Sequence, residues 1–295
     1  MMVLDFEEEL AEAKLSGLYP EMPMAEYRKA DGLANSELQL FKVNPASYEW
    51  NKQAPSDPLK ATSADFGTAL HSSILEPETY EDSVVVSSTK GRTSESFTHF
   101  QRAHPDKIVL TEIEYDQIAI MTNSAECDPM FNKILCAEGV CESSIFVTDP
   151  TTGVDCKIRP DKIYFTDKPN LCDVKSAADL DEWRQDKPWL NPLFKFNYGF
   201  TAAYYLHIAS IHYQMELTEY TFLVVSKSAR LGKYPVSVFV ITKEELIEYG
   251  FWDEMIGSLA SFAERQRGGD FTSYESFPEF HLYQDEKVEV TFEGE

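Results

Sequence analysis

The chain has 295 residues, of which 43% are hydrophobic and 26% charged, as in an ordinary globular protein with a sizeable core. No run approaches the roughly 18 apolar residues of a membrane span, and the N-terminus is acidic where a signal peptide is basic, so we expect a cytoplasmic protein without membrane association. Five cysteines without a CxxC pair argue against a disulfide framework or a zinc ribbon.

The formal charge of −24 is unusual for a nucleic-acid binder, which is expected to carry a basic surface. The charge is unevenly placed. Residues 150–235 hold 11 Lys and Arg against 10 Asp and Glu, whereas the remainder holds 15 against 40. The acidic excess is either a solvated surface that promotes solubility, or a surface that repels nucleic acid or imitates DNA.

The N-terminal half is predicted to be mostly helical. Residues 1–30 form an acidic extension with a proline-containing connection. Capping residues and apolar spacing predict helices over residues 35–50, 63–75 and 111–135. A Ser/Thr-rich stretch at residues 87–98 is typical of a mobile loop.

The C-terminal half predicts a small mixed sheet flanked by helices. Alternating apolar residues and turn signals indicate a hairpin, then further strands and helices. The hairpin strands are residues 140–148 and 154–165, and the later strands are residues 171–175, 220–226 and 236–241. The helices are residues 192–213 and 243–267. One α/β domain is therefore expected over residues 31–267, with an acidic tail over residues 268–295.

Two short motifs in this half carry the candidate chemistry. Arg159-Pro160-Asp161 is expected in the second hairpin strand, and Asp173-Val174-Lys175 in the adjacent strand. Alternation places Asp173 and Lys175 on one face. Two neighbouring carboxylates repel unless a cation lies between them, and hard oxygen ligands suit Mg²⁺ or Mn²⁺. A surface hairpin with salt-bridged charges would show the same pattern.

Other blocks occur around these motifs in a definite order. They are the Asn35-Ser36-Glu37-Leu38 helix with Asn44-Pro45-Ala46, Phe66-Gly67-Thr68-Ala69-Leu70-His71, Leu75-Glu76-Pro77, the run from Thr152 to Asp161, Asp173-Val174-Lys175, and the Tyr-rich helix that begins near Asn197. In this order, over about residues 31–265, they resemble the exodeoxyribonuclease VIII (RecE-type) family. That family belongs to the PD-(D/E)xK nucleases and is related to lambda exonuclease and to RecB-type nuclease domains.

The resemblance implies a restriction-endonuclease-like fold, with a mixed central sheet, flanking helices and helical N-terminal additions. It implies that His71, Asp161 and Asp173 bind Mg²⁺, with Mn²⁺ as a substitute, and that Lys175 is the catalytic lysine. The backbone carbonyl of Val174 would be a further ligand. Glu142 would bind a second metal or support the first, unless it is only an exposed acid at the start of a strand.

Substrate contacts are expected from Arg159, Tyr198 and Tyr205, and from a turn that carries Lys227, Arg230 and Lys233. The tyrosines could equally pack in the core, and the basic turn could be solvated. The family usually has Gln four residues before the helical tyrosine, where this chain has Thr201.

The activity implied by the resemblance is 5′-to-3′ digestion of double-stranded DNA ends, which leaves a 3′ single strand for an annealing recombination protein. A homo-oligomeric ring and a phage or prophage origin in a bacterial host cell are expected on the same basis. The alternative is a catalytically silent, acidic binding protein on the same fold, a DNA mimic or a regulator of a partner.

Overall fold

The computed structural model describes residues 14–53, 58–184 and 190–273. The first part of the predicted acidic extension and most of the predicted tail lie outside these ranges. Within the extension, β1 (Gly17–Tyr19) pairs with a strand of the main fold, opposite residues 144–146. This segment is thus part of a sheet.

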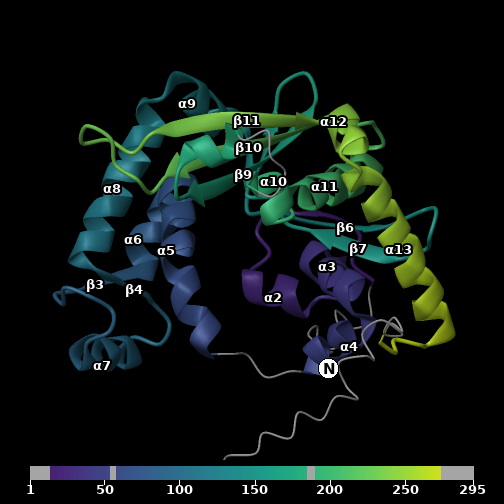
Figure 1. The fold of residues 1–295 in the computed structure, drawn as a ribbon, viewed down its shortest axis with the longest axis horizontal. Coiled ribbons are helices and arrows are strands. Elements are labelled where there is room, and N and C mark those ends of the chain that lie inside the picture. Colours follow the sequence, from purple (N-terminus) through teal and green to yellow (C-terminus); the bar gives the residue numbers. More distant parts are fainter. Residues whose placement is uncertain (1–13, 54–57, 185–189, 274–295) are drawn as a thin grey trace, which may run out of the picture.

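A five-stranded mixed sheet forms the centre of the molecule (Figure 1). Its order is β11 (Val236–Thr242), β10 (Glu219–Ser226), β9 (Pro169–Ala177), β8 (Lys162–Phe165) and β5 (Gly139–Cys141). β9 and β10 are parallel and the other neighbours are antiparallel. The predicted mixed sheet flanked by helices is therefore confirmed.

The predicted hairpin over residues 140–165 divides between two sheets. Its outer halves are β5 and β8 of the central sheet. Its inner halves, β6 (Ser144–Thr148) and β7 (Asp155–Ile158), join β1 and β2 (Leu33–Ala34) in a second sheet. The prediction of two continuous strands is wrong, because both strands break, at residues 142–143 and 159–161.

Four predicted helices are each divided in two. The breaks lie at Asn44, at Asp128, at Phe196-Asn197 and at Tyr249-Gly250. Pro45 and Pro129 begin the second helix in the first two cases, since proline lacks the N–H that a helix interior requires. At the last two breaks Asn197 and Gly250 have φ values of +56° and +80°, and only glycine adopts such values without steric cost.

The stretch predicted as a loop, residues 87–98, is a loop over residues 88–94, whereas its two ends belong to a strand and a helix. β3 (Val84–Ser87) pairs with β4 (Ile108–Thr111), and α7 (Glu95–Ala103) lies between them. The Ser94 hydroxyl accepts a hydrogen bond from the Phe97 amide and so caps α7.

The remaining helices are α2 (Met24–Lys29), α3 (Asn35–Val43), α4 (Pro45–Gln53), α5 (Pro58–Leu75), α6 (Pro77–Ser83), α8 (Glu112–Cys127), α9 (Pro129–Leu135), η1 (Leu180–Arg184), α10 (Pro192–Lys195), α11 (Tyr198–Tyr213), α12 (Lys243–Glu248) and α13 (Phe251–Gly268).

The central sheet is buried on both faces. On one face Cys172, Val174 and Leu223 pack against α5, α8 and α9. On the other face Leu171 and Phe222 pack under α11, which in turn contacts α3 and α13. In Figure 1 α5 and α8 lie on the left of the molecule and α3 and α13 on its right, with β9, β10 and β11 at the top between them. Successive side chains of a strand point to opposite faces, so neighbouring residues of one strand belong to different cores.

The cysteines and helices agree with the expectations from composition. All five cysteines are free thiols, and Cys156 and Cys172 are buried. Within the described ranges, no helix combines the length and the apolar character needed to cross a bilayer.

Candidate active site

Asp161 lies at the break between β7 and β8, where the bent hairpin meets the central sheet. Its Oδ2 atom accepts a hydrogen bond of 2.7 Å from the Val174 amide and lies 3.4 Å from Nδ1 of His71 on α5. Its own amide lies 3.5 Å from Oδ1 of Asp173 on β9. The predicted histidine and both predicted aspartates are therefore brought together from three separate segments.

Glu142 completes the cluster from the other break of the hairpin. Its amide donates to the Asp161 carbonyl, which joins the two breaks directly. Its φ is +47°, a backbone conformation that costs a non-glycine residue free energy. Ligand atoms of His71, Glu142 and Asp161 all lie within 4.8 Å of one another. Glu142 is thus a central member of the cluster and is not a solvent-exposed acid.

The acids of this cluster repel one another. Burial, followed by the charge of Asp161, raises the pKa of Glu142 to about 7. Burial, followed by the charge of Asp173, raises the pKa of Asp161. Carboxylates held together in this way favour protonation or a cation between them.

Lys175 lies beside Asp173 on the same face of β9, as alternation predicts. Its Nζ atom is 2.9 Å from Oδ2 of Asp173 and 5.5 Å from the centre of the Tyr198 ring. Burial opposes the charge on Lys175, but Asp173 and Asp161 more than offset it and raise the pKa. Lys175 is therefore a positive charge at neutral pH, fixed next to the acids.

The donor set fits a divalent cation. Carboxylate oxygens and one imidazole are ligands that Mg²⁺ and Mn²⁺ accept. The amide and carbonyl of an extended residue point to the same side of its strand, so the Val174 carbonyl faces the side where its amide meets Asp161. The hydroxyl of buried Tyr220 makes no hydrogen bond of standard geometry to the described residues, and it lies close enough to the Asp173 carboxylate for that group to raise the pKa of Tyr220 further after burial. Such a polar atom suits a hydrated ion nearby.

Arg159, predicted as a substrate contact, makes its hydrogen bonds within the protein, and its contact with substrate remains a prediction. Its side chain is only 10% exposed. Nε donates to Glu142 (3.0 Å), and Nη1 donates to the Met22 carbonyl and to Ser144. The Tyr205 hydroxyl donates to the Arg159 carbonyl at 3.3 Å. Arg159 and Tyr205 therefore hold the hairpin break in place.

The predicted basic cluster lies elsewhere, on the turn between β10 and β11. Lys227, Arg230 and Lys233 are exposed, but Arg230 pairs with Asp179 and Asp181 of the neighbouring loop. Lys227 and Lys233 make no ion pair within the described ranges. Among the residues that the structure describes, no hydrogen bond or ion pair links this turn to the carboxylates, so its role in substrate binding remains a prediction.

Thr201 occupies the helix position where the resemblance suggested glutamine. Its hydroxyl accepts hydrogen bonds from Asn35 (3.0 Å) and Gln39 (3.3 Å) of α3. The side-chain oxygen Oε1 of Gln39 in turn accepts a hydrogen bond from the side-chain amide of Asn197. An amide from another helix thus reaches the place where the expected side chain is missing.

Two residues near the acids were not predicted from the sequence. Glu76, at the N-cap of α6, adds a weaker negative charge near Glu142. Tyr220 lies on β10 beside the strand that carries Asp173. The sequence contains an indication of each residue. Glu76 belongs to one of the collinear blocks, and Tyr220 lies on the same sheet face as Phe222.

The comparisons with known proteins agree with this geometry. The chain resembles in structure a protein from Eubacterium rectale whose crystal structure is described as that of a "Putative exonuclease". The TM-score is 0.56 and the identity 14%, and the alignment covers 86% of this chain and 89% of that one, so the likeness shows the fold. No curated protein matches the chain significantly. Residues 35–252 match the family described as "PDDEXK-like domain of unknown function (DUF3799)". Because this match spans well over half of the sequence and includes every acid of the cluster, the chain belongs to that family of PDDEXK-like domains.

Proposed function

We propose that the protein is a metal-dependent deoxyribonuclease that digests double-stranded DNA from its ends in the 5′-to-3′ direction. The observation that carries the proposal is Lys175, which lies 2.9 Å from Asp173 and beside the cluster of His71, Glu142 and Asp161. A fixed positive charge next to convergent hard ligands is an arrangement that suits phosphodiester hydrolysis.

The residues divide the work by position. His71, Glu142, Asp161 and Asp173 would hold Mg²⁺, with Mn²⁺ as a substitute, together with the Val174 carbonyl. When bound, the cation supplies an activated water and neutralises charge on the phosphate. Lys175 is held protonated by Asp173 and Asp161, and it stabilises negative charge that develops on the phosphate. Arg159 and Tyr205 keep Glu142 and Asp161 in register.

The finer parts of the proposal come from the sequence resemblance. A 3′ single strand would remain for an annealing recombination protein, as expected in a phage or prophage system in a bacterial cytoplasm. A homo-oligomeric ring around the DNA would explain the charge distribution, with residues 150–235 near the channel and the acidic excess outside. Light scattering of the purified protein measures the oligomer directly, and a monomer would contradict the ring.

Digestion of linear and covalently closed circular DNA tests the activity. We expect loss of linear DNA alone with Mg²⁺, no loss with EDTA, and at least a hundredfold slower loss with Lys175→Ala. Lys133→Ala, an exposed lysine on α9, is the matched control and should cut normally. Release of label from 5′ ends before 3′ ends gives the polarity.

One alternative has an observation in its favour. The charge of −24 suits an acidic binding protein that imitates DNA or regulates a partner. The absence of cutting on both substrates, with no DNA binding at low salt, would favour this alternative. Cutting of the closed circle would indicate an endonuclease.

A further inference from the structure

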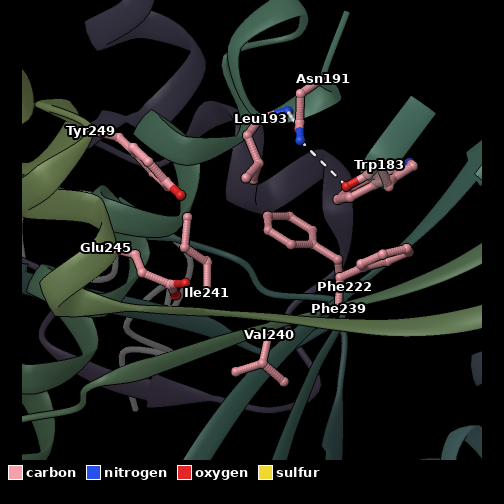
Figure 2. A pocket seen from close by; sticks show the side chains of 9 residues that line it. All are labelled: Trp183, Asn191, Leu193, Phe222, Phe239, Val240, Ile241, Glu245 and Tyr249. Carbon is pink, nitrogen blue, oxygen red and sulfur yellow. Dashed lines mark hydrogen bonds between the residues drawn. The ribbon is translucent and has the colours of Figure 1, made fainter. Parts of the chain in front are cut away.

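A second concave site lies on the central sheet near the candidate active site. It is a half-open cavity of about 180 Å³ at the edge strand β11. Figure 2 shows aromatic side chains of the sheet and η1 converging on it from several elements. The residues that matter for the argument are Trp183, Leu193, Phe222, Phe239, Glu245 and Tyr249.

The sheet register places this cavity in line with the active-site acids. Asp173 on β9 pairs with Phe222 on β10, and Phe222 pairs with Phe239 on β11. Paired residues share a face, so all three side chains lie on the face that carries Lys175. Because neighbouring strands are about 4.8 Å apart, Phe239 lies about 10 Å from Asp173 across the sheet.

Stacked rings connect the cavity to the lysine. Trp183 stacks on Phe239, with ring centres 5.2 Å apart and planes at 20°. Tyr198 also stacks on Trp183, with ring centres 5.8 Å apart and planes at 19°. Tyr198 in turn lies under the ammonium group of Lys175. The cavity and the candidate active site therefore share a wall, and what binds in one is held at a fixed distance from the other.

The size of the cavity and the residues that line it indicate which kind of molecule can bind there. The volume is below the roughly 300 Å³ at which pockets for drug-sized ligands begin, so it suits one ring system. Aromatic side chains bind bases of single-stranded nucleic acid by stacking. The Glu245 carboxylate, of which one oxygen accepts from Thr242, would repel a phosphate but can accept from a base amino group.

We propose that this cavity binds one unstacked nucleobase of the DNA strand that is being cut, next to the nucleotide whose phosphate lies at Lys175. The inference rests on the proposed nuclease function. A base can enter the cavity only after it has separated from its paired base and from its stacked neighbours. The enzyme then opens the end of a duplex by at least one base pair before it cuts.

Abasic substitutions test the proposal. A series of oligonucleotides carries one abasic nucleotide at successive positions from the end, and cleavage is measured with Mg²⁺. We expect KM to rise about tenfold at one position only, as for the loss of one stacked base. The Tyr249 side chain is 47% exposed, so its truncation should be tolerated. In the Tyr249→Ala variant we expect KM for intact DNA to rise by the same factor of about ten. On the oligonucleotide with the abasic nucleotide at the sensitive position, KM of the Tyr249→Ala variant should equal that of the wild type. Leu193→Trp, which fills the cavity, should behave like Tyr249→Ala.

The control variant is Phe165→Ala, which removes an exposed ring from β8 and should leave the abasic series unchanged. Anisotropy of the same labelled oligonucleotides in EDTA measures binding without cleavage. Normal cleavage with equal effects at every abasic position would overturn the base cavity and leave the nuclease standing. A position-specific effect on binding without any cleavage would support the cavity against the nuclease. A protein that neither binds nor cuts DNA would overturn both.

Discussion

At the scale of single residues, Arg159 decides the stability of the hairpin break. Its guanidinium lies in the protein and holds the Glu142 carboxylate, the Ser144 hydroxyl and the Met22 carbonyl. Arg159→Met leaves a buried acid without its partner, so we expect the free energy of unfolding to fall by about 3 kcal/mol. Arg184→Met, at a surface pair, should change it by less than about 0.5 kcal/mol. Urea unfolding of both variants measures the difference, and equal effects would contradict the buried role.

Asp149 at the β6–β7 turn predicts acid sensitivity. Burial opposes its ionisation, but the backbone and side chain of Thr152 and the His207 ring more than offset this and hold the pKa of Asp149 below its usual range. A lowered folded-state pKa means stabilisation that is present above about pH 4 and lost as the pH falls through the folded-state pKa.

Asp149→Asn should therefore cost about 2 kcal/mol at pH 7, since hydrogen bonds to a charged group are lost. The gap to the wild type should narrow below pH 4. Unfolding by urea at several pH values measures both quantities. A gap that is independent of pH would show that the carboxylate charge contributes nothing.

At the scale of elements, the packing of α11 on α13 depends on Gly199. A Cβ atom placed there would lie 2.3 Å from the Phe251 ring. Gly199→Ala should therefore destabilise the protein by about 1–3 kcal/mol, although alanine is the better helix former. Gly257→Ala on α13, where nothing lies within 4 Å, should instead stabilise it by up to about 1 kcal/mol. Thermal unfolding should show shifts of opposite sign, and shifts of the same sign would contradict the close approach.

The sequence predicts the type of most elements but not their breaks. Pro45, Pro129 and Gly250 are local helix breakers that mark three of the four helix breaks, whereas no proline or glycine stands at the fourth, at Phe196-Asn197. The hairpin is different. No local signal at Glu142 announces a left-handed backbone, because this conformation is imposed by contacts with Asp161 and Arg159. Long-range contacts of this kind decide which sheet each half-strand joins.

At the scale of the whole molecule, alternation and strand order are local rules that predict Asp161, Asp173 and Lys175 close together. The places of His71 and Glu142 beside them were expected only from the resemblance. The internal contacts of Arg159 depend on Met22 and Glu142, and the aromatic cavity depends on how η1 and α10 fold over the sheet, so neither follows from local rules. The positive charge of the turn with Lys227 and Lys233 predicts a contact with the phosphate backbone, but composition gives no information on how far the turn lies from Asp161.

A bound cation should stabilise the whole fold, since its ligands come from α5, the hairpin and β9. We expect Mg²⁺ to raise the melting temperature, with about 2.7 kcal/mol of stabilisation at a hundredfold excess over its Kd. Asp161→Asn should raise the melting temperature of the metal-free protein, because it removes repulsion from Asp173, and should abolish the response to Mg²⁺. Calorimetric scans with Mg²⁺ and with EDTA measure both effects, and a wild type indifferent to Mg²⁺ would contradict the site.

The separation of the ligands along the chain has a consequence for biosynthesis. His71 and Asp161 are 90 positions apart, and the strand that carries Asp173 is completed by a parallel partner that begins only at Glu219. Contacts of such long range form late and slowly, because closing the intervening loops costs entropy. A nascent chain on the ribosome therefore holds the reactive groups apart until most of the polypeptide has emerged. The proposed nuclease activity would therefore appear only after most of the chain has been synthesised.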